Sequence, residues 1–348
     1  MLNKENYLPY ELYRRKWRLT VVPMKKFEGI NYQGEKYAED DAIILSDSDF
    51  EEGNTHALHV RFNVNSSLSV PKFGEVTIYN LSNDMMETLK QGTRVVLEAG
   101  YEDGNFGVIW NANIYHFIER RENIVDRVLT MHCMDGYEIF KDCFVYAHVT
   151  KDRNTILDKY KEVVKQTGID AVETPAALSD SSNKKSARAA TIIGSPSNAI
   201  NEISKSANGT IAGETKMSKI AIVDGKVTIT DPNAIGIGEE LVVSPETGLI
   251  GTPSATQYGV IFRSLLDPRL LFTDPLVQVK IERSEVIAQP QRYGQTVAPV
   301  VPPRDGRYKV ISVNHIGDTR GTEWYSDCEC VVNPDQIINL GQLQGLGK

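Results

Sequence analysis

The feature that most constrains the fold is the alternation of polar and apolar side chains in short segments of the first 145 residues. Residues 59–65 (HVRFNVN) place Val60, Phe62 and Val64 on one side of an extended chain, which predicts a half-buried strand. Further strands rich in Val, Ile, Tyr and Thr, with a hairpin signal at residues 102–105, are predicted over residues 74–81, 93–101, 106–118 and 123–134. This part of the chain therefore predicts a small barrel or sandwich.

One short helix is predicted between these strands. Ser82 is its candidate N-cap, because a serine oxygen can accept a hydrogen bond from a free backbone N–H of the first turn. Met85, Met86 and Leu89 form an apolar stripe at helical spacing. Gly92 is expected just beyond the C-terminus of the helix, where glycine is favoured.

The hydrophobic period changes from 2 to 3.6 in the middle of the chain. Residues 155–168 predict an amphipathic helix that starts with the capping pair Thr155 and Asp158. A second helix is predicted from Ser195, with Pro196 in its first turn. A polar segment, expected to be a mobile loop open to proteolysis, and a hairpin complete a small α/β unit: residues 178–190 and 221–229.

Strand patterns return in the last third of the chain, over residues 240–243, 259–266, 276–282, 306–316 and 322–332. Residues 288–304 contain four prolines and predict a long loop that contacts a neighbouring subunit or is poorly ordered. The fold class is therefore mainly β with a small α/β insert. The domains expected are a first barrel, the α/β insert, a second barrel and a flexible tail, at residues 1–145, 146–232, 233–340 and 341–348.

Charge and hydropathy exclude several classes of protein. The chain of 348 residues has 46 acidic and 38 basic side chains, a net charge of −8, which argues against a nucleic-acid binder held by bulk positive charge. No apolar run approaches the roughly 18–20 residues of a membrane span. Residues 1–11 lack the apolar region of a signal peptide. We therefore expect a soluble, acidic protein of several domains.

The four cysteines are Cys133, Cys143, Cys328 and Cys330, too few for a disulfide scaffold in a chain of this length. Cys328 and Cys330 fall on the same side of a predicted strand as Trp324. We expect small buried core thiols, with a metal or redox role as the alternative.

Candidate catalytic and binding groups do not assemble into a motif. His315 and Asp318 could suggest hydrolysis, but the stretch that includes Gly317 and Gly321 is expected to be a hairpin tip with turn glycines. His56 and His59 are three apart on a predicted strand, so they point to opposite faces and cannot share a metal ion. Short glycine clusters and acidic pairs also lack a supporting pattern: residues 236–238, 345–348, 40–41 and 51–52. We therefore predict no catalytic residue, no cofactor and no metal.

One basic cluster, Arg14, Arg15, Lys16 and Arg18 around Trp17, stands near the N-terminus. Two interpretations stay open: it contacts an acidic partner surface, or it is the solvated lead-in to the first strand.

Two groups of short segments stand out by their order along the chain. The first-domain segments are GEVTIYNLS (74–82), TRVVLEAGY (93–101) and LTMHCMDG (129–136). The C-terminal segments are TGLIGTP (247–253), FRSLLDP (262–268), GRYKV (306–310) and HIGDTRG (315–321) followed by Trp324 and Tyr325. Taken in order, these segments resemble the baseplate hub proteins of contractile-tailed bacteriophages of the Mu-like and T-even-like groups. The resemblance is weakest over residues 140–220.

The resemblance implies a structural protein of the virion baseplate, made in the host cytoplasm. It implies a homotrimer in which two tube-like barrels per chain form a ring of six, adapting a sixfold tail tube to a threefold spike. The partners it implies are tail tube or tube-initiator proteins, a separate spike protein and baseplate wedge proteins. DNA would meet the chain only while passing through the lumen, where an acidic wall would repel phosphate. The tail at residues 341–348 is a candidate spike contact.

Three alternatives remain. A tail-associated cell-wall hydrolase would need a catalytic pair in a cleft, and a sugar-binding module would need exposed aromatic rings among Trp17, Trp110 and Trp324. The sequence also allows the hub of a phage-derived contractile injection system.

Overall fold

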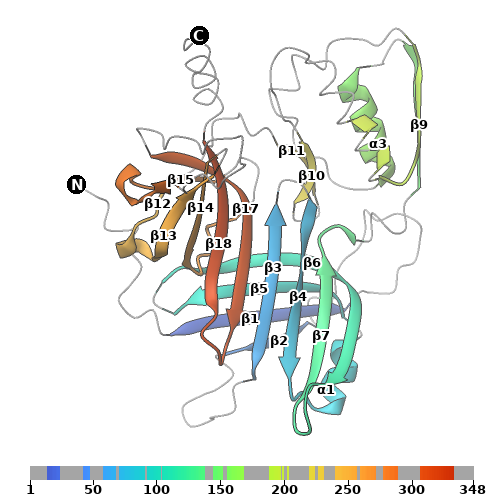
Figure 1. Cartoon of the computed structure of the whole chain (residues 1–348). Helices are drawn as coiled ribbons and strands as arrows, with labels where there is room; N and C mark the ends of the chain where they lie inside the picture. The colour runs from blue at the N-terminus through green and yellow to red at the C-terminus, as the bar shows by residue number, and fades with distance from the viewer. Residues whose placement is uncertain are drawn as a thin grey trace, which may run out of the picture.

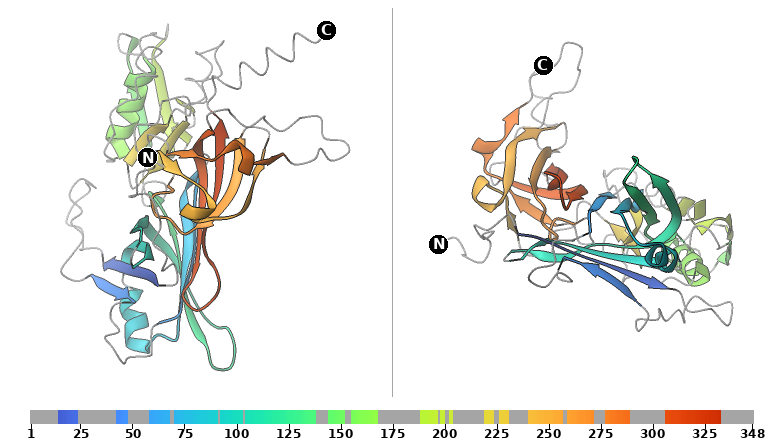
Figure 2. Two further views of the ribbon diagram at one scale, coloured as in Figure 1. Left: turned by 90° about the vertical axis from the view of Figure 1, so that its left-hand side faces the viewer. Right: turned by 90° about the horizontal axis from the view of Figure 1, so that it is seen from below.

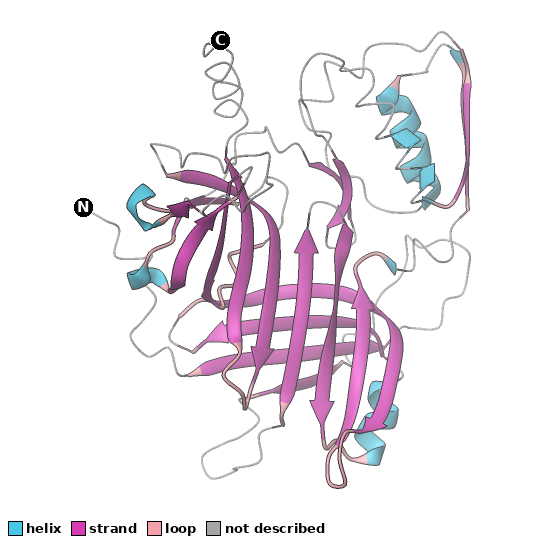
Figure 3. Cartoon of the chain, in the orientation of Figure 1, coloured by secondary structure: helices cyan, strands magenta, loops and turns pink. Residues whose placement is uncertain are grey.

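The chain is mainly β, as predicted, and most of its strands belong to one long sheet (Figure 3). The computed structural model describes residues 14–23, 42–47, 58–67, 70–90, 92–102, 104–137, 144–151, 155–167, 188–196, 198–199, 202–203, 219–223, 226–230, 240–256, 259–271, 277–288 and 306–332. Among the described residues, no helix has the length and apolar character needed to cross a bilayer.

The first module consists of seven strands and one helix. They are β1 (Arg15–Pro23), β2 (Ile43–Ser46), β3 (Val60–Ser67), β4 (Val70–Tyr79), α1 (Asn83–Leu89), β5 (Gly92–Tyr101), β6 (Phe106–Arg121) and β7 (Arg127–Met134). All neighbours pair antiparallel, in the order β3–β4–β7–β6–β5–β1–β2. Strands β1, β5 and β6 run across the direction of β3, β4 and β7, so the sheet folds over into two crossed layers (Figure 1).

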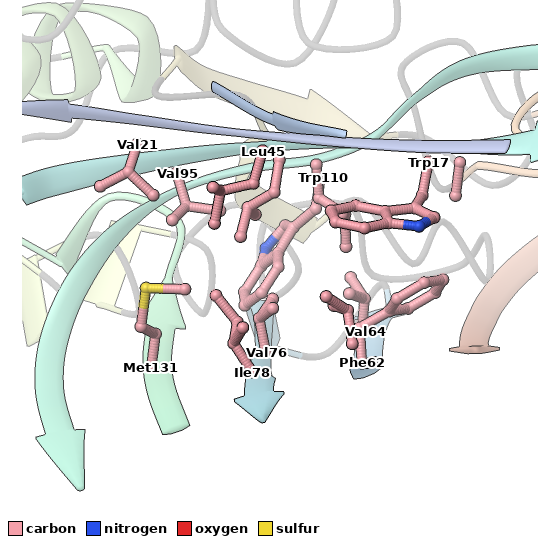
Figure 4. Close-up of a cluster of buried hydrophobic side chains, with 14 of the residues drawn as sticks. Trp17, Val21, Leu45, Phe62, Val64, Val76, Ile78, Val95, Trp110 and Met131 are labelled. Carbon is pink, nitrogen blue, oxygen red and sulfur yellow. The ribbon is translucent and has the colours of Figure 1, made fainter. Parts of the chain in front are cut away.

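The alternating side chains of the strands fill the space between the two layers (Figure 4). Strand β3 alternates buried and exposed residues as its sequence predicts, and Val60, Phe62 and Val64 all face the core. Trp110 of β6 is fully buried between the layers. Burial of large apolar side chains stabilises such a core by roughly 1.5–3 kcal/mol each.

Helix α1 closes one end of this module. The Ser82 Oγ accepts a hydrogen bond from the Met85 N–H at 3.2 Å, which confirms the predicted N-cap. Met86 and Leu89 are buried, as the stripe predicts. The expectation for Gly92 is wrong: Lys90 is the C-cap, and Gly92 is the first residue of β5. A Cβ on Gly92 would overlap the side chain of Val21, so close packing explains this glycine.

The second module contains the strands β12 (Leu241–Val242), β13 (Leu249–Ala255), β14 (Gly259–Leu265), β15 (Gln278–Lys280), β16 (Ile287–Ala288), β17 (Arg307–Asp318) and β18 (Trp324–Val332). It has a hydrophobic core of its own, which includes Phe262, Tyr308 and Val310. The sheet continues through both modules as β16–β13–β14–β18–β17–β3–β4–β7–β6–β5–β1–β2. Among the described strands this path ends at β2 and β16 and does not close into a barrel.

A smaller αβ element follows the first module in sequence. Strands β8 (Val145–Val149) and β9 (Ala190–Gly194) pair antiparallel, and helix α3 (Ile156–Thr167) packs against β8 (Figure 1). Thr155 and Asp158 form the predicted capping box, with each side chain bonded to the backbone N–H of the other. The predicted hairpin is present as β10 (Lys219–Val223) and β11 (Lys226–Thr230).

The remaining predictions are tested only where the structure describes the chain. Pro196, Asn198, Ala199, Glu202 and Ile203 are helical, as expected for the helix that starts at Ser195. Most of the polar segment 178–190, most of the proline-rich segment 288–304 and the tail 341–348 lie outside the described residues. The domain boundaries stay predictions.

Candidate functional site at the junction of the two modules

The two modules are joined by a strand pair that connects residues about 250 positions apart. Strand β17 pairs antiparallel with β3 along seven positions, from Ser312 opposite Ser67 to Asp318 opposite Arg61. The same strand pairs with β18 on its other side. Figure 1 shows β18, β17, β3 and β4 side by side in one layer. The backbone ladder therefore makes one structural unit of the two modules.

Trp324, at the start of β18, reaches from the second module into the core of the first. Its side chain is buried, and its Nε1–H donates a hydrogen bond to the backbone oxygen of Gly100 in β5 at 3.2 Å. Its ring meets the ring of Phe62 edge to face, with centroids 5.3 Å apart. The adjacent Gly317 leaves room for Phe62, because a Cβ there would overlap the phenyl ring.

The turn between β17 and β18 is tied to β3 by its own polar groups. The Asp318 carboxylate accepts hydrogen bonds from the backbone N–H groups of Arg320 and Gly321, at 2.8 and 2.7 Å. The Thr319 N–H donates to the Val60 oxygen, and the Val60 N–H donates to the Thr319 hydroxyl, both at 3.0 Å. These bonds extend the junction beyond the strand ladder.

Arg15 of β1 completes the junction from the far layer of the first module. Its Nη1 donates to the backbone oxygens of Asp318 and Gly321 at 2.8 and 2.6 Å, and its guanidinium lies 5.5 Å from the Trp324 ring centroid. The basic residues predicted near the N-terminus therefore lie on β1 and, for Arg14, directly before it. Arg18 pairs with Glu98, and Trp17 is buried in the core.

His59 and Arg61 contact the same carboxylate. The His59 Nε2 lies 2.8 Å from Asp318 Oδ1, and the Arg61 Nε lies 3.4 Å from Oδ2. The His59 ring stacks on Tyr79, with ring centroids 4.1 Å apart. Burial alone would raise the pKa of Asp318, but the two backbone N–H donors and His59 hold this pKa below its ordinary value.

His315 is not at a hairpin tip, as the sequence suggested, but within β17 and fully buried. Its Nδ1 lies 2.8 Å from the Ser326 Oγ of β18. The pKa of His315 is lowered to about 4, chiefly by burial, while Asp267 opposes the shift and the nearby Lys72 adds to it. The imidazole is therefore neutral at pH 7, and with no exposed surface it has no route to a substrate.

The cysteine prediction is confirmed where the structure describes it. Trp324, Ser326, Cys328, Cys330 and Val332 share the buried face of β18. Burial raises the pKa of the Cys328 and Cys330 thiols well above the ordinary value, and Cys133 of the first core behaves likewise. Cys143, His56, the glycine clusters at 236–238 and 345–348 and the acidic pairs at 40–41 and 51–52 lie outside the described residues. Within the part of the chain that is described, no group of His, Cys, Asp and Glu could hold a metal ion.

The tryptophans bear on the sugar-binding alternative. Trp17, Trp110 and Trp324 are all buried, so none offers a ring to a sugar. The outer face of the continuous sheet instead carries amides at the junction, with Asn314 directly opposite Asn65.

Charges on this outer face are largely arranged in pairs. Arg263 binds Asp327 through two hydrogen bonds of 2.6 and 2.8 Å, and Arg61 contacts Asp318. Glu75 and Glu329 are exposed carboxylates on the same face. The described part of the face therefore has no surplus of positive charge, although it also exposes the apolar side chains of Phe73 and Ile261.

Comparison with known proteins identifies the fold. No protein-family model and no curated protein matches the sequence. Among solved structures, a chain of the PdpA–VgrG complex in its lidless form is similar at 8% identity and a TM-score of 0.51, over 92% of this chain and 65% of that chain. The half-lidded Francisella PdpA–VgrG complex gives 9% identity and a TM-score of 0.50, over 96% and 61%.

The 43 kDa tail protein of prophage MuSo2 from Shewanella oneidensis is also similar, at 8% identity and a TM-score of 0.48, over 80% of this chain and 97% of that chain. The chain therefore shares its fold with chains of the PdpA–VgrG complex, at TM-scores of 0.50 and 0.51. This chain spans about two thirds of the length of the VgrG-complex chains.

Proposed function

We propose that this chain is the structural hub of the baseplate in a contractile phage tail. Three copies would form a ring that adapts the sixfold tail tube to a threefold spike and surrounds the DNA channel. The two β modules would act as the tube-like barrels, with the αβ element between them as an insert.

The observation that carries this proposal is the single sheet that crosses both modules through the β17–β3 pair. Two modules held by a backbone ladder and by the buried Trp324 keep a fixed relative orientation. Three rigid pairs placed around a threefold axis give six similar units, which is the number needed to match a sixfold tube.

The outer face of the continuous sheet is the proposed channel wall. Its central amides, Asn65 and Asn314, are neutral, and Arg61 and Arg263 are each held by an aspartate. Glu75 and Glu329 add negative charge. A wall of this kind offers DNA phosphates few cations to bind, so a genome could slide past it.

The partners proposed are tail tube or tube-initiator proteins, a separate spike protein and baseplate wedge proteins. We further propose that the chain acts without catalysis. The burial of His315 supports this, because the imidazole nearest to a serine hydroxyl in the junction has no contact with solvent.

Electron microscopy of purified protein and of assembled tails tests the proposal. We expect a ring with threefold symmetry and six similar densities, at the end of the tube, and a solution mass three times the 38.8 kDa of one chain. A monomer in assembled tails, or a position outside the baseplate, would refute the hub role. Clearing of peptidoglycan by the purified protein would favour the hydrolase alternative.

The hub of a phage-derived injection system is the second candidate. The likeness to chains of the PdpA–VgrG complex favours it, since these have the higher TM-scores of the structures compared. Imaging of the assembled particle separates the two, because a phage tail carries a DNA-filled head.

A further inference from the structure

The hairpin between β6 and β7 displays two aliphatic side chains to solvent. Ile124 and Val125 are 95% and 82% exposed, the highest values among the large hydrophobic side chains described. The hairpin projects past the ends of the neighbouring strands, next to α1 (Figures 1 and 2). Single exposed aliphatic residues are common, but an adjacent pair at the apex of a projecting hairpin gives a partner a small apolar patch to cover.

The apex is held in one conformation by side-chain hydrogen bonds. The Asn123 Oδ1 accepts from the N–H groups of Val125 and Asp126, at 2.8 and 2.7 Å. The Asn123 Nδ2 donates to the Asp126 carboxylate, which also accepts from the Asn80 Nδ2 at 2.8 Å. Because the turn is already ordered, docking of Ile124 and Val125 would cost little conformational entropy.

The stem of the hairpin is braced against α1. Glu119 of β6 accepts from Lys90 Nζ at 2.8 Å and from Arg127 Nε at 2.9 Å. Arg127 also donates to the side-chain oxygen of Asn83 in the first turn of α1. These contacts link the projecting strands to α1, so the apex has a fixed position relative to the body of the module.

We propose that Ile124 and Val125 form a plug that inserts into an apolar recess of a different protein, the one stacked on this end of the hub. This inference rests on the proposed function, which supplies the stacked neighbour. In a trimer three plugs engage together, and their combined avidity compensates for the small area of each.

The charges around the apex favour a protein recess over a membrane. Three basic and three acidic residues balance in the stem and turn: Arg120, Arg121, Arg127, Glu119, Glu122 and Asp126. An anionic lipid surface attracts segments with a surplus of Lys and Arg, which this apex lacks. A tip-to-tip contact between two copies would have only these two residues per side, far below the ~1,200 Å² of a specific interface, whereas a recess in a stacked protein adds to the larger contact that stacking itself makes.

Photo-crosslinking in the assembled particle tests the plug. A photoreactive phenylalanine analogue replaces Ile124 in the chain, particles are assembled from the complete tail gene set, and linked peptides are identified by mass spectrometry. We expect peptides of a different tail protein, from an apolar segment. Links to this chain itself would overturn the plug in favour of self-association.

Matched variants provide the second measurement. Ile124→Ser with Val125→Ser should leave the melting temperature of the isolated chain unchanged, because both side chains are exposed, and lower the yield of complete particles by about tenfold or more. Ile124→Leu with Val125→Ile, which keeps the apex apolar, should restore the yield. Normal assembly by the double serine variant would overturn the plug.

Three further outcomes separate the causes of failure. Sedimentation with phosphatidylcholine–phosphatidylglycerol vesicles that is lost in the double serine variant would overturn the protein recess in favour of a membrane. A wild-type chain missing from purified particles would overturn the hub role and the plug with it. A chain present in intact particles with an unlinked apex overturns the plug alone.

Discussion

Gly317 of β17 and the ring of Phe62 of β3 occupy adjoining space at the junction of the two modules. A Cβ on Gly317 would lie 2.8 Å from Phe62 Cε2 and still closer to two other ring atoms. The two residues come from strands separated by about 250 positions, so the glycine is required by tertiary packing and not by the turn that follows it.

Substitution of Gly317 by alanine should therefore destabilise the fold by about 1–3 kcal/mol, through overpacking against the phenyl ring. Urea denaturation measures this change. The double variant with Phe62→Leu should recover part of the loss, because a smaller side chain makes room. Gly107→Ala, whose Cβ would have its nearest contact at 3.5 Å from Pro268, is the control and should be nearly neutral.

Trp324→Ala should cost about 3–5 kcal/mol, because it empties a buried site and leaves the Gly100 oxygen without its donor. Chemical denaturation followed by circular dichroism gives the value. Tyr325→Ala lies on the opposite face of the same strand, beneath the guanidinium of Arg263, and should cost less than half as much. Equal losses would mean that Trp324 does not lock the modules.

Asp318→Asn should weaken the junction by about 1–3 kcal/mol at pH 7, since the carboxylate accepts two backbone N–H bonds and faces His59 and Arg61. The folded pKa of Asp318 lies below the ordinary 3.8. Its contribution is therefore present above about pH 4 and is lost as the pH falls through the folded pKa. Stability curves of both proteins should converge in strong acid. Parallel curves would refute this role.

His315 should make the fold sensitive to mild acid. Its pKa is about 4 in the folded chain against an ordinary 6.5, so the unfolded chain takes up the proton first as the pH falls. Between pH 6.5 and 4 the free energy of unfolding should fall by about 3 kcal/mol, at roughly 1.4 kcal/mol per pH unit. His315→Asn should flatten the curve over this range.

The buried cysteines should resist thiol reagents in the folded protein. Burial raises the pKa of Cys133, Cys328 and Cys330, so the reactive thiolate is scarce at pH 8. Labelling followed by peptide mass spectrometry should find these three sites modified only on the timescale of unfolding. Rapid labelling of Cys328 or Cys330 would contradict the buried face of β18.

Local sequence signals predicted much of the secondary structure because they depend on near neighbours. Alternation identified β3, β5 and β18, and the side chains of Ser82 and Thr155 marked the starts of α1 and α3. The same alternation is present in β1, where Trp17, Leu19 and Val21 face the core and alternate with the polar residues Lys16, Arg18 and Thr20. Residues 123–126, expected to start a strand, form the hairpin turn instead, because the Asn123 side chain bonds to the backbone two and three residues on.

The junction was decided by tertiary structure alone. A period of 2 tells which side chains share a face but not which strand lies alongside, so nothing in the sequence pairs β17 with β3 or brings Arg15 to the turn at Asp318. The buried state of His315 has the same origin, since its desolvation comes from elements far away in the chain. The sequence by itself determined the strands, the caps and the buried thiols, because neighbours within a few positions carry those signals. Only packing between distant segments decided that the two modules share one sheet.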